Sequence, residues 1–258
     1  MLLNYSDDGP GPVVVLLHGF PMDHRIWNPQ RASVGATYRL IAPDLRGHGA
    51  SAAPEGVYSM EEMAGDVHEL LDALGIHEPI VLGGHSMGGY VAQAFAARYP
   101  DRLRGLVLIN TRAGADSEEA ARKREETASQ VEASEDVEPV VESMLPRLLS
   151  PSILKQKPKL VHQVRSMMVR TPARAVAGAL RGMARRLDRL DLLRTLKTPA
   201  LVLAGENDAI VPLDEARAMA NALPLGQLEV IPDCGHLAPL ENPDATNNAL
   251  LAFLNELP

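Results

Sequence analysis

Cysteine is almost absent from this sequence, since Cys234 is the only one among 258 residues. A single cysteine cannot form an intrachain disulfide, so we expect a fold held together by its core in a reducing compartment. Aromatic residues make up only 3% of the chain, which leaves few side chains on which nucleic-acid bases could stack. These shortages exclude a disulfide scaffold and disfavour a binder of single-stranded nucleic acid.

Positive charge is also in deficit. The chain has 25 Lys and Arg against 33 Asp and Glu, a formal net charge of −8, which disfavours nucleic acid and anionic membranes as partners. The apolar run at 13–17 is too short to cross a bilayer, and residues 1–8 lack the basic start and apolar core of a signal peptide. We therefore predict a cytoplasmic protein with no nucleic-acid or membrane partner, and the sequence leaves its oligomeric state open.

What the sequence does have is an alternation of short apolar runs with helical patterns. Several runs consist almost wholly of Val, Ile and Leu, as expected for strands that are buried on both faces. The alternation predicts an α/β fold, in which a mostly parallel twisted sheet carries helices on both faces. Strands are expected at 13–17, 40–42, 80–82, 106–109, 201–203 and 228–231.

Two helices are predicted with defined ends. The first spans 59–74, with Ser59 and Glu62 forming a capping box and Gly75 ending the helix. The second spans 242–257, with Asn242 as its cap and Pro243 in its first position.

The alternation stops between residues 112 and 198, where no strand pattern is present. This stretch is rich in Ala, Glu, Arg, Leu and Met, and it predicts an all-helical cap inserted into a core domain of residues 1–111 and 199–258. We expect the cap to lie over the carboxyl ends of the strands, where ligands bind in open α/β sheets. Five prolines are expected to divide it into short helices: Pro139, Pro146, Pro151, Pro158 and Pro172.

The most informative motif is the G-x-S-x-G pentapeptide at 84–88, which contains Ser86. An apolar strand run precedes it and a helical pattern follows it, so Ser86 lies on a strand-to-helix turn. Such a turn lifts a serine hydroxyl out of the backbone at strained dihedral angles, with glycines on both sides to avoid clashes. The context predicts a nucleophilic serine.

A serine hydroxyl needs a base to take its proton, and the base needs a third group to orient it. His236 is the best candidate base and Asp208 the best candidate acid, because each follows the end of a different predicted strand. Their chain order, Ser then Asp then His, is the order of the nucleophile-elbow architecture. Asp233 is the nearest rival acid, and Cys234 is better explained as a small buried side chain than as a nucleophile.

An oxyanion hole should complete this site. We predict that the N–H of Met87, at the start of the helix after Ser86, supplies one donor and the N–H of Phe20 the other. His18 is expected to order the Phe20 loop. The remaining histidines lack metal-ligand spacing, so we predict no metal and no cofactor.

With these motifs, the chain resembles an α/β-hydrolase over nearly its whole length. Within that superfamily it is similar to capped carboxylesterases and enol-lactonases. Only about a dozen residues precede the first apolar run, so the antiparallel strands that usually open the sheet must be shortened or partly absent. The resemblance implies hydrolysis of an ester or lactone through an acyl-enzyme. The matching stretches are HGFP at 18–21, DLRGHG at 44–49, GHSMGG at 84–89, GEND at 205–208 and CGH at 234–236.

The leading functional hypothesis is a carboxylesterase that cleaves small esters. A lactonase or enol-lactonase is the main alternative within the enzymes, and a ligand-binding protein that does not turn over is the alternative from another class. A carbon–carbon bond hydrolase fits less well because of the HGFP loop, and perhydrolysis could be a side activity. Four apolar residues are candidates for the substrate pocket: Trp27, Met144, Leu148 and Met168.

Overall fold

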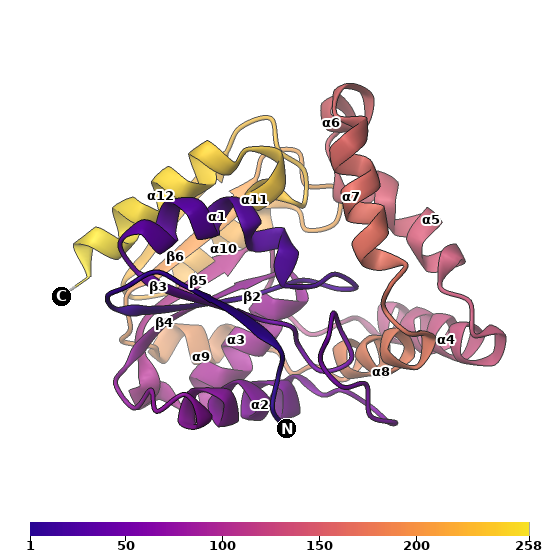
Figure 1. The fold of residues 1–258 in the computed structure, drawn as a ribbon, viewed down its shortest axis with the longest axis horizontal. Coiled ribbons are helices and arrows are strands. Elements are labelled where there is room, and N and C mark those ends of the chain that lie inside the picture. The colour runs from indigo at the N-terminus through magenta and orange to yellow at the C-terminus, as the bar shows by residue number, and fades with distance from the viewer. Residues whose placement is uncertain (258) are drawn as a thin grey trace.

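The computed structural model of the protein describes residues 1–257 and arranges seven strands in one sheet (Figure 1). Their order across the sheet is β1-β3-β2-β4-β5-β6-β7. Strand β1 pairs with β3 in the antiparallel direction, and all the other neighbours are parallel. The predicted mostly parallel sheet is confirmed. The strands are β1 (Tyr5–Asp8), β2 (Val13–Leu17), β3 (Arg39–Pro43), β4 (Ile80–His85), β5 (Leu103–Ile109), β6 (Ala200–Gly205) and β7 (Gly226–Ile231).

Strand β2 shows why the buried strands are continuous apolar runs in the sequence. Val13, Val15 and Leu17 join the hydrophobic cluster on one face of the sheet, whereas Val14 and Leu16 join the cluster on the other face. Successive side chains of a strand point to opposite faces, and here both faces are covered. No polar position interrupts β2, because neither of its faces meets water.

Helices cover the sheet on both sides, as predicted (Figure 1). Side chains of α2, α3, α9 and α10 belong to the first cluster, and those of α11 and α12 belong to the second. Helix α1 packs against α11 and α12. The bounds of these helices are α1 (Asn28–Ser33), α2 (Met60–Ala73), α3 (Met87–Arg98), α9 (Leu190–Thr195), α10 (Leu213–Ala222), α11 (Ala238–Glu241) and α12 (Pro243–Glu256), with 3-10 turns at His24–Trp27, Val34–Ala36 and Pro100–Arg102.

Both predicted helix starts are confirmed. At α2 the Ser59 hydroxyl accepts the N–H of Glu62 at 3.2 Å, and the Glu62 carboxylate accepts the N–H of Ser59 at 3.2 Å. At α12 the side chain of Asn242 accepts the N–H of Ala245, and Pro243 occupies the first position. These caps satisfy amide groups that have no partner within a helix.

Strand β1 was not among the expected strands, although the resemblance implied a shortened antiparallel opening. Two of its four residues are aspartates, which gives it no apolar run to recognise. Asp7 forms an ion pair with Arg39 of β3 at 2.7 Å, and Asp8 forms one with Arg31 of α1 at 2.6 Å. Both negative charges of β1 are therefore paired. Charged edge strands of this kind are common at the borders of sheets.

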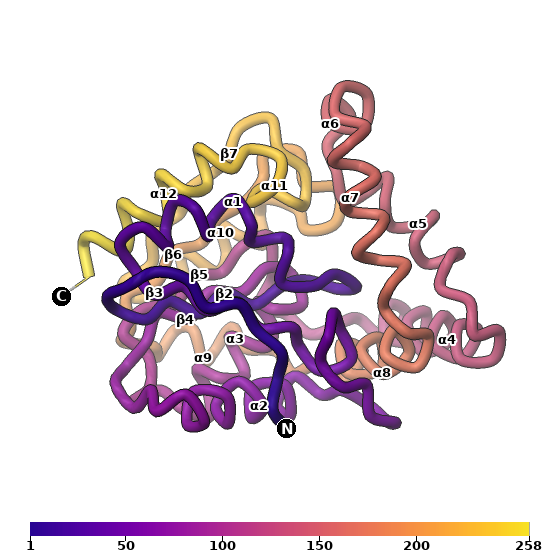
Figure 2. Tube along the Cα trace, viewed as in Figure 1, coloured from indigo at the N-terminus to yellow at the C-terminus, as the bar shows by residue number. Residues whose placement is uncertain are grey.

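Between β5 and β6 the chain forms helices without a strand, in agreement with the prediction for residues 112–198, which we call the insertion. Figure 2 shows α6 and α7 standing away from the sheet, above α4 and α8. Helix α4 packs on α8, and α5 packs on α7. The division into a core domain and a cap at residues 112 and 198 remains our proposal. Besides α9, the helices of the insertion are α4 (Glu118–Ser134), α5 (Glu138–Leu148), α6 (Pro151–Gln156), α7 (Pro158–Met168) and α8 (Ala173–Ala184).

One proline does not divide the insertion as expected. Pro139, Pro151 and Pro158 stand at helix starts and Pro172 caps α8, but Pro146 lies inside α5. It sits in the last turn, where the missing N–H removes one hydrogen bond shortly before the helix ends at Leu148. None of the helices within residues 1–257 is long and apolar enough to cross a membrane. The cytoplasmic location stays a prediction.

Candidate active site at the carboxyl ends of the strands

Ser86 lies on a sharp turn between β4 and α3, with φ 52° and ψ −113°. A non-glycine residue with positive φ is strained, and such strain is found mainly at functional sites. Glycines on both sides make the turn possible. A Cβ on Gly84 would lie 2.1 Å from the carbonyl oxygen of Gly88, and a Cβ on Gly88 would lie 2.5 Å from that of Leu17. The sequence motif is therefore explained by backbone contacts around Ser86.

The three predicted residues meet at this turn. His236 Nε2 lies 2.8 Å from Ser86 Oγ, and His236 Nδ1 lies 2.7 Å from Asp208 Oδ2. The side chains of His236 and Asp208 are 2% exposed and thus shielded from solvent, whereas Ser86 is partly exposed. These distances suit proton transfer from the hydroxyl to the imidazole.

Asp208 is held as a carboxylate. Burial by itself would raise the pKa of this group, but His236 and the hydrogen bonds from Val211 and Asn110 outweigh burial, and the pKa is lowered. The other carboxylate oxygen accepts the N–H groups of Ile210 and Val211 at 2.8 and 2.9 Å. Since the Asp208 oxygen can only accept, the proton of His236 is assigned to Nδ1, which leaves Nε2 free to accept from Ser86.

One predicted oxyanion donor, Met87, directly follows Ser86, and the other, Phe20, follows Gly19, where a Cβ would lie 3.2 Å from Ser86 Cβ. Within residues 1–257, neither the N–H of Phe20 nor that of Met87 is donated to an acceptor. Met87 is the first residue of α3, where unpaired amides and the helix dipole favour a negative charge. His18 orders the Phe20 loop, because its Nε2 accepts the N–H of Leu45 and its Nδ1 donates to the carbonyl of Gly19, each at 2.9 Å.

Asn110 is a member of this site that the sequence analysis missed. It follows β5 in a left-handed conformation, with φ 46°, and its side-chain N–H donates to Asp208 Oδ2 at 2.9 Å and to the carbonyl of Gly235 at 3.3 Å. The same carboxylate oxygen accepts from His236, so Asn110 fixes the acid that orients the base. The one feature of the sequence that could have revealed Asn110 is its position, because it is a polar residue directly after the buried strand β5.

His85 lies behind the base. Its ring is fully buried, and its Nε2 donates to the carbonyl oxygen of His236 at 2.7 Å. Burial, followed by the neighbouring His236, lowers the pKa of His85 to about 3, so this ring stays neutral. His85 therefore packs against His236 and donates one hydrogen bond to its backbone.

The insertion lines most of a cavity of about 570 Å³. Tyr90, Arg112 and Ile210 also line it, and in the chain these residues follow shortly after Ser86, Asn110 and Asp208, respectively. Met144 lines this cavity. The other three pocket candidates, Trp27, Leu148 and Met168, are at most 1% exposed among core side chains.

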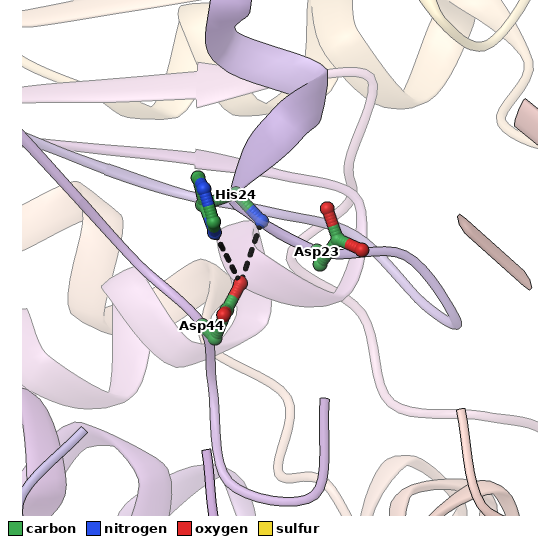
Figure 3. A group of neighbouring side chains, drawn as sticks. All are labelled: Asp23, His24 and Asp44. Carbon is green, nitrogen blue, oxygen red and sulfur yellow. Dashed lines mark hydrogen bonds and ion pairs between the residues drawn. The ribbon is translucent and has the colours of Figure 1, made fainter. Parts of the chain in front are cut away.

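A second cluster of polar side chains, formed by Asp23, His24 and Asp44, has the atoms to hold a metal ion (Figure 3). Its oxygens already have partners, however. Asp44 accepts the Nδ1–H and backbone N–H of His24 as well as the N–H of Ala50, and Asp23 accepts from the guanidinium of Arg25. These bonds account for both carboxylates, so we interpret the cluster as a set of hydrogen bonds that stabilises the loop after β3.

The same cluster predicts a pH dependence of stability. The carboxylate of Asp44 raises the pKa of His24 against the opposing effect of burial. A group with a raised pKa in the folded state contributes stability that is complete below its unfolded pKa of about 6.5 and is lost as the pH rises through the folded value. We expect His24→Gln to be less stable than the parent by up to about 1 kcal/mol at about pH 6, with the difference shrinking by about pH 8.

Urea unfolding of both proteins at the two pH values measures this difference. Groups that do not interact with His24 contribute equally to parent and variant, so the comparison reports His24 together with its neighbours Asp44 and His18. A difference that grows as the pH rises would contradict the assignment.

Comparison with known proteins agrees with this architecture. Residues 12–243 match the family model described as the alpha/beta hydrolase fold. A solved thermophilic esterase from Thermogutta terrifontis, with malate bound, is 45% identical, with 98% of this chain and 93% of that chain covered and a TM-score of 0.96. The solved enol-lactonase from Burkholderia xenovorans LB400 is 30% identical, with 98% and 96% covered and a TM-score of 0.91.

Among curated proteins, the 3-oxoadipate enol-lactonase 2 of Acinetobacter baylyi is 27% identical over 98% of this chain and 92% of its own length. The family match extends from strand β2 to the start of α12, so it includes the elbow, both loops that carry Asp208 and His236, and the whole insertion. This chain therefore belongs to the alpha/beta hydrolase family of enzymes.

Proposed function

We propose that the protein is a carboxylesterase that cleaves small carboxylic esters through an acyl-enzyme formed on Ser86. The observation that carries the proposal is the chain of two short hydrogen bonds, from Ser86 Oγ to His236 and from His236 to Asp208, at 2.8 and 2.7 Å. The similarity to an esterase at 45% identity supports it.

In the proposed reaction, Ser86 Oγ attacks the ester carbonyl while His236 Nε2 takes its proton. The oxyanion of the tetrahedral intermediate accepts the N–H groups of Phe20 and Met87. His236 then gives the proton to the leaving alkoxide, and the alcohol departs from the acyl-enzyme. Water, deprotonated by His236, attacks the acyl carbon, and Ser86 recovers its proton as the acid leaves. These steps require no cofactor.

A lactone or ester that carries a carboxylate is the second candidate substrate, because most of the charged residues that line the cavity of the insertion are cationic. Asp116 is shared by Arg124 and Arg186, at 2.6 Å each. In the described part of the chain, Lys123 and Arg147 form no ion pair. An excess of positive charge in a protein of net charge −8 would attract an anionic substrate. The charged residues of the lining are Arg112, Asp116, Lys123, Arg124, Asp136, Arg147 and Arg186.

The test is a set of initial rates on p-nitrophenyl esters from acetate to decanoate, beside a panel of lactones. We expect a maximum at short or medium acyl chains, and a loss of about 10⁴-fold or more in Ser86→Ala. Faster turnover of lactones would favour the second candidate. If no substrate shows turnover that depends on Ser86, the esterase proposal fails and a ligand-binding protein becomes the better hypothesis.

A further inference from the structure

Glu241, the last residue of α11, is a buried carboxylate outside the proposed triad, and its residue is 4% exposed. Its oxygens accept backbone N–H groups rather than side chains. Oε1 accepts from Gly235 and Leu237, both at 3.1 Å, and Oε2 accepts from Ser150 at 2.8 Å and from Gly235 at 3.1 Å. Hydrogen bonds to a buried ionised group are among the stronger ones in proteins.

These amides belong to two segments that are distant in the sequence. Gly235 and Leu237 are the residues on either side of His236, whereas Ser150 is the N-cap of α6 in the insertion. A Cβ on Gly235 would come within 2.7 Å of the nitrogen of Ser150, so the two backbones are in direct contact. The N–H of His236 also donates to the carbonyl of Leu148, at 3.1 Å. Glu241 thus joins the loop of the candidate base to the insertion.

The imidazole of His236 must reach two partners at once, Ser86 Oγ on one side and Asp208 on the other. Its backbone is held through both neighbouring amides by one carboxylate oxygen, so displacement of that oxygen would move the ring. Misplacement of a reacting group by about 1 Å can lower a rate by about 100-fold. We propose that Glu241 is a positioning residue that holds the imidazole of His236 at hydrogen-bonding distance from Ser86. Because Glu241 also binds Ser150, this distance depends on where the insertion lies. This proposal rests on the proposed function of Ser86 and His236.

The principal test is Glu241→Gln, which keeps the shape of the side chain. Because both carboxylate oxygens accept N–H groups, the amide nitrogen of glutamine must face a donor on one side. Titration with a fluorophosphonate counts the folded sites that can react at Ser86. We expect kcat per titrated site on a p-nitrophenyl ester to fall about tenfold with KM within about twofold, and the rate constant of fluorophosphonate labelling to fall in the same proportion.

A matched control separates positioning from stability. Asp66 on α2 is a comparably buried carboxylate, with its side chain 3% exposed, and it is bound by Arg46 outside the candidate site. Asp66→Asn is expected to lower the melting temperature while kcat per titrated site stays within about twofold of the parent. If Glu241→Gln behaves in the same way, Glu241 is only structural and the proposal is overturned.

Ser150→Pro tests the connection to the insertion without changing residue 241, because the proline ring replaces the N–H that lies 2.8 Å from Glu241 Oε2 and pushes that oxygen away. The φ of Ser150 is −62° and the ψ of Leu149 is 144°, which are values that a proline and its preceding residue adopt, and the change removes the N–H that Glu241 accepts. We expect kcat per titrated site to fall about threefold to tenfold. An unchanged value would refute the link to the insertion, even if Glu241→Gln fails to fold. A parent without Ser86-dependent ester turnover would refute the proposed function instead, and the labelling rate would still test Glu241.

Discussion

Asp208→Asn is expected to lower kcat on a good ester substrate by about 10⁴-fold while the fold is retained. Asparagine would place an N–H donor where the His236 Nδ1–H now donates. The imidazole would then favour the opposite tautomer, with its proton on Nε2, and could no longer accept the proton of Ser86. Steady-state kinetics and circular dichroism of the purified variant measure the two parts of this expectation.

Asp233→Asn is the matched control, because Asp233 was the rival acid in the sequence. Asp233 is exposed and left-handed at φ 57°, a conformation that asparagine tolerates well. We expect its kcat to stay within about twofold of the parent, since an exposed side chain outside the hydrogen-bonded triad does not act on His236. If kcat falls strongly in Asp233→Asn and only slightly in Asp208→Asn, then Asp233 and not Asp208 is the acid that orients His236.

Gly84→Ala is expected to have the largest effect on stability. The new methyl group would lie 2.1 Å from the carbonyl oxygen of Gly88 and 2.5 Å from the nitrogen of Gly89, and backbone atoms at the start of α3 cannot rotate away as a side chain can. We expect a loss of about 3 kcal/mol, which corresponds to about 6–12 °C in melting temperature for a chain of this size. Activity should fall as well, because the turn carries Ser86.

Gly65→Ala provides the opposite expectation for the same chemical change. Gly65 lies within α2, and a Cβ there would meet only the Arg98 guanidinium, at an ordinary 3.6 Å. Replacing a glycine inside a helix by alanine should stabilise the protein by about 0.5–1 kcal/mol. Equal effects of the two substitutions in urea or thermal unfolding would show that crowding around the elbow is not what requires Gly84.

The sheet and the positions of the three candidate residues Ser86, Asp208 and His236 could be predicted because their signals are local. Ser86 and Asp208 follow the buried apolar strands β4 and β6, and His236 follows the more polar border strand β7, so the parallel topology brings all three to one edge. The capped helix α2 was equally readable from Ser59 and Glu62. The hydroxyl of Ser59 and the carboxylate of Glu62 bind backbone groups only three residues away, so this capping box is visible in the sequence.

The contacts that complete the site could not be predicted, because they join segments that only the folded chain brings together. Asn110 reaches Asp208 across neighbouring strands, and Glu241 binds an amide of the insertion as well as its own loop. No spacing rule connects such pairs. Strand β1 was not predicted for a different reason, because an edge strand with two aspartates among its four residues has no apolar periodicity.

The charges on the two border strands affect how the molecules behave when they are crowded together. Edge strands present unpaired N–H and C=O groups, and a second molecule can extend the sheet by docking there. On β1 that edge carries Asp7 and Asp8, and on β7 it carries the exposed side chains of Gln227 and Glu229. Asp7 and Asp8 are paired with Arg39 and Arg31, so a second molecule docking on β1 would have to desolvate two ion pairs, and on β7 it would have to desolvate Gln227 and Glu229. This cost disfavours edge-to-edge aggregation in concentrated solution.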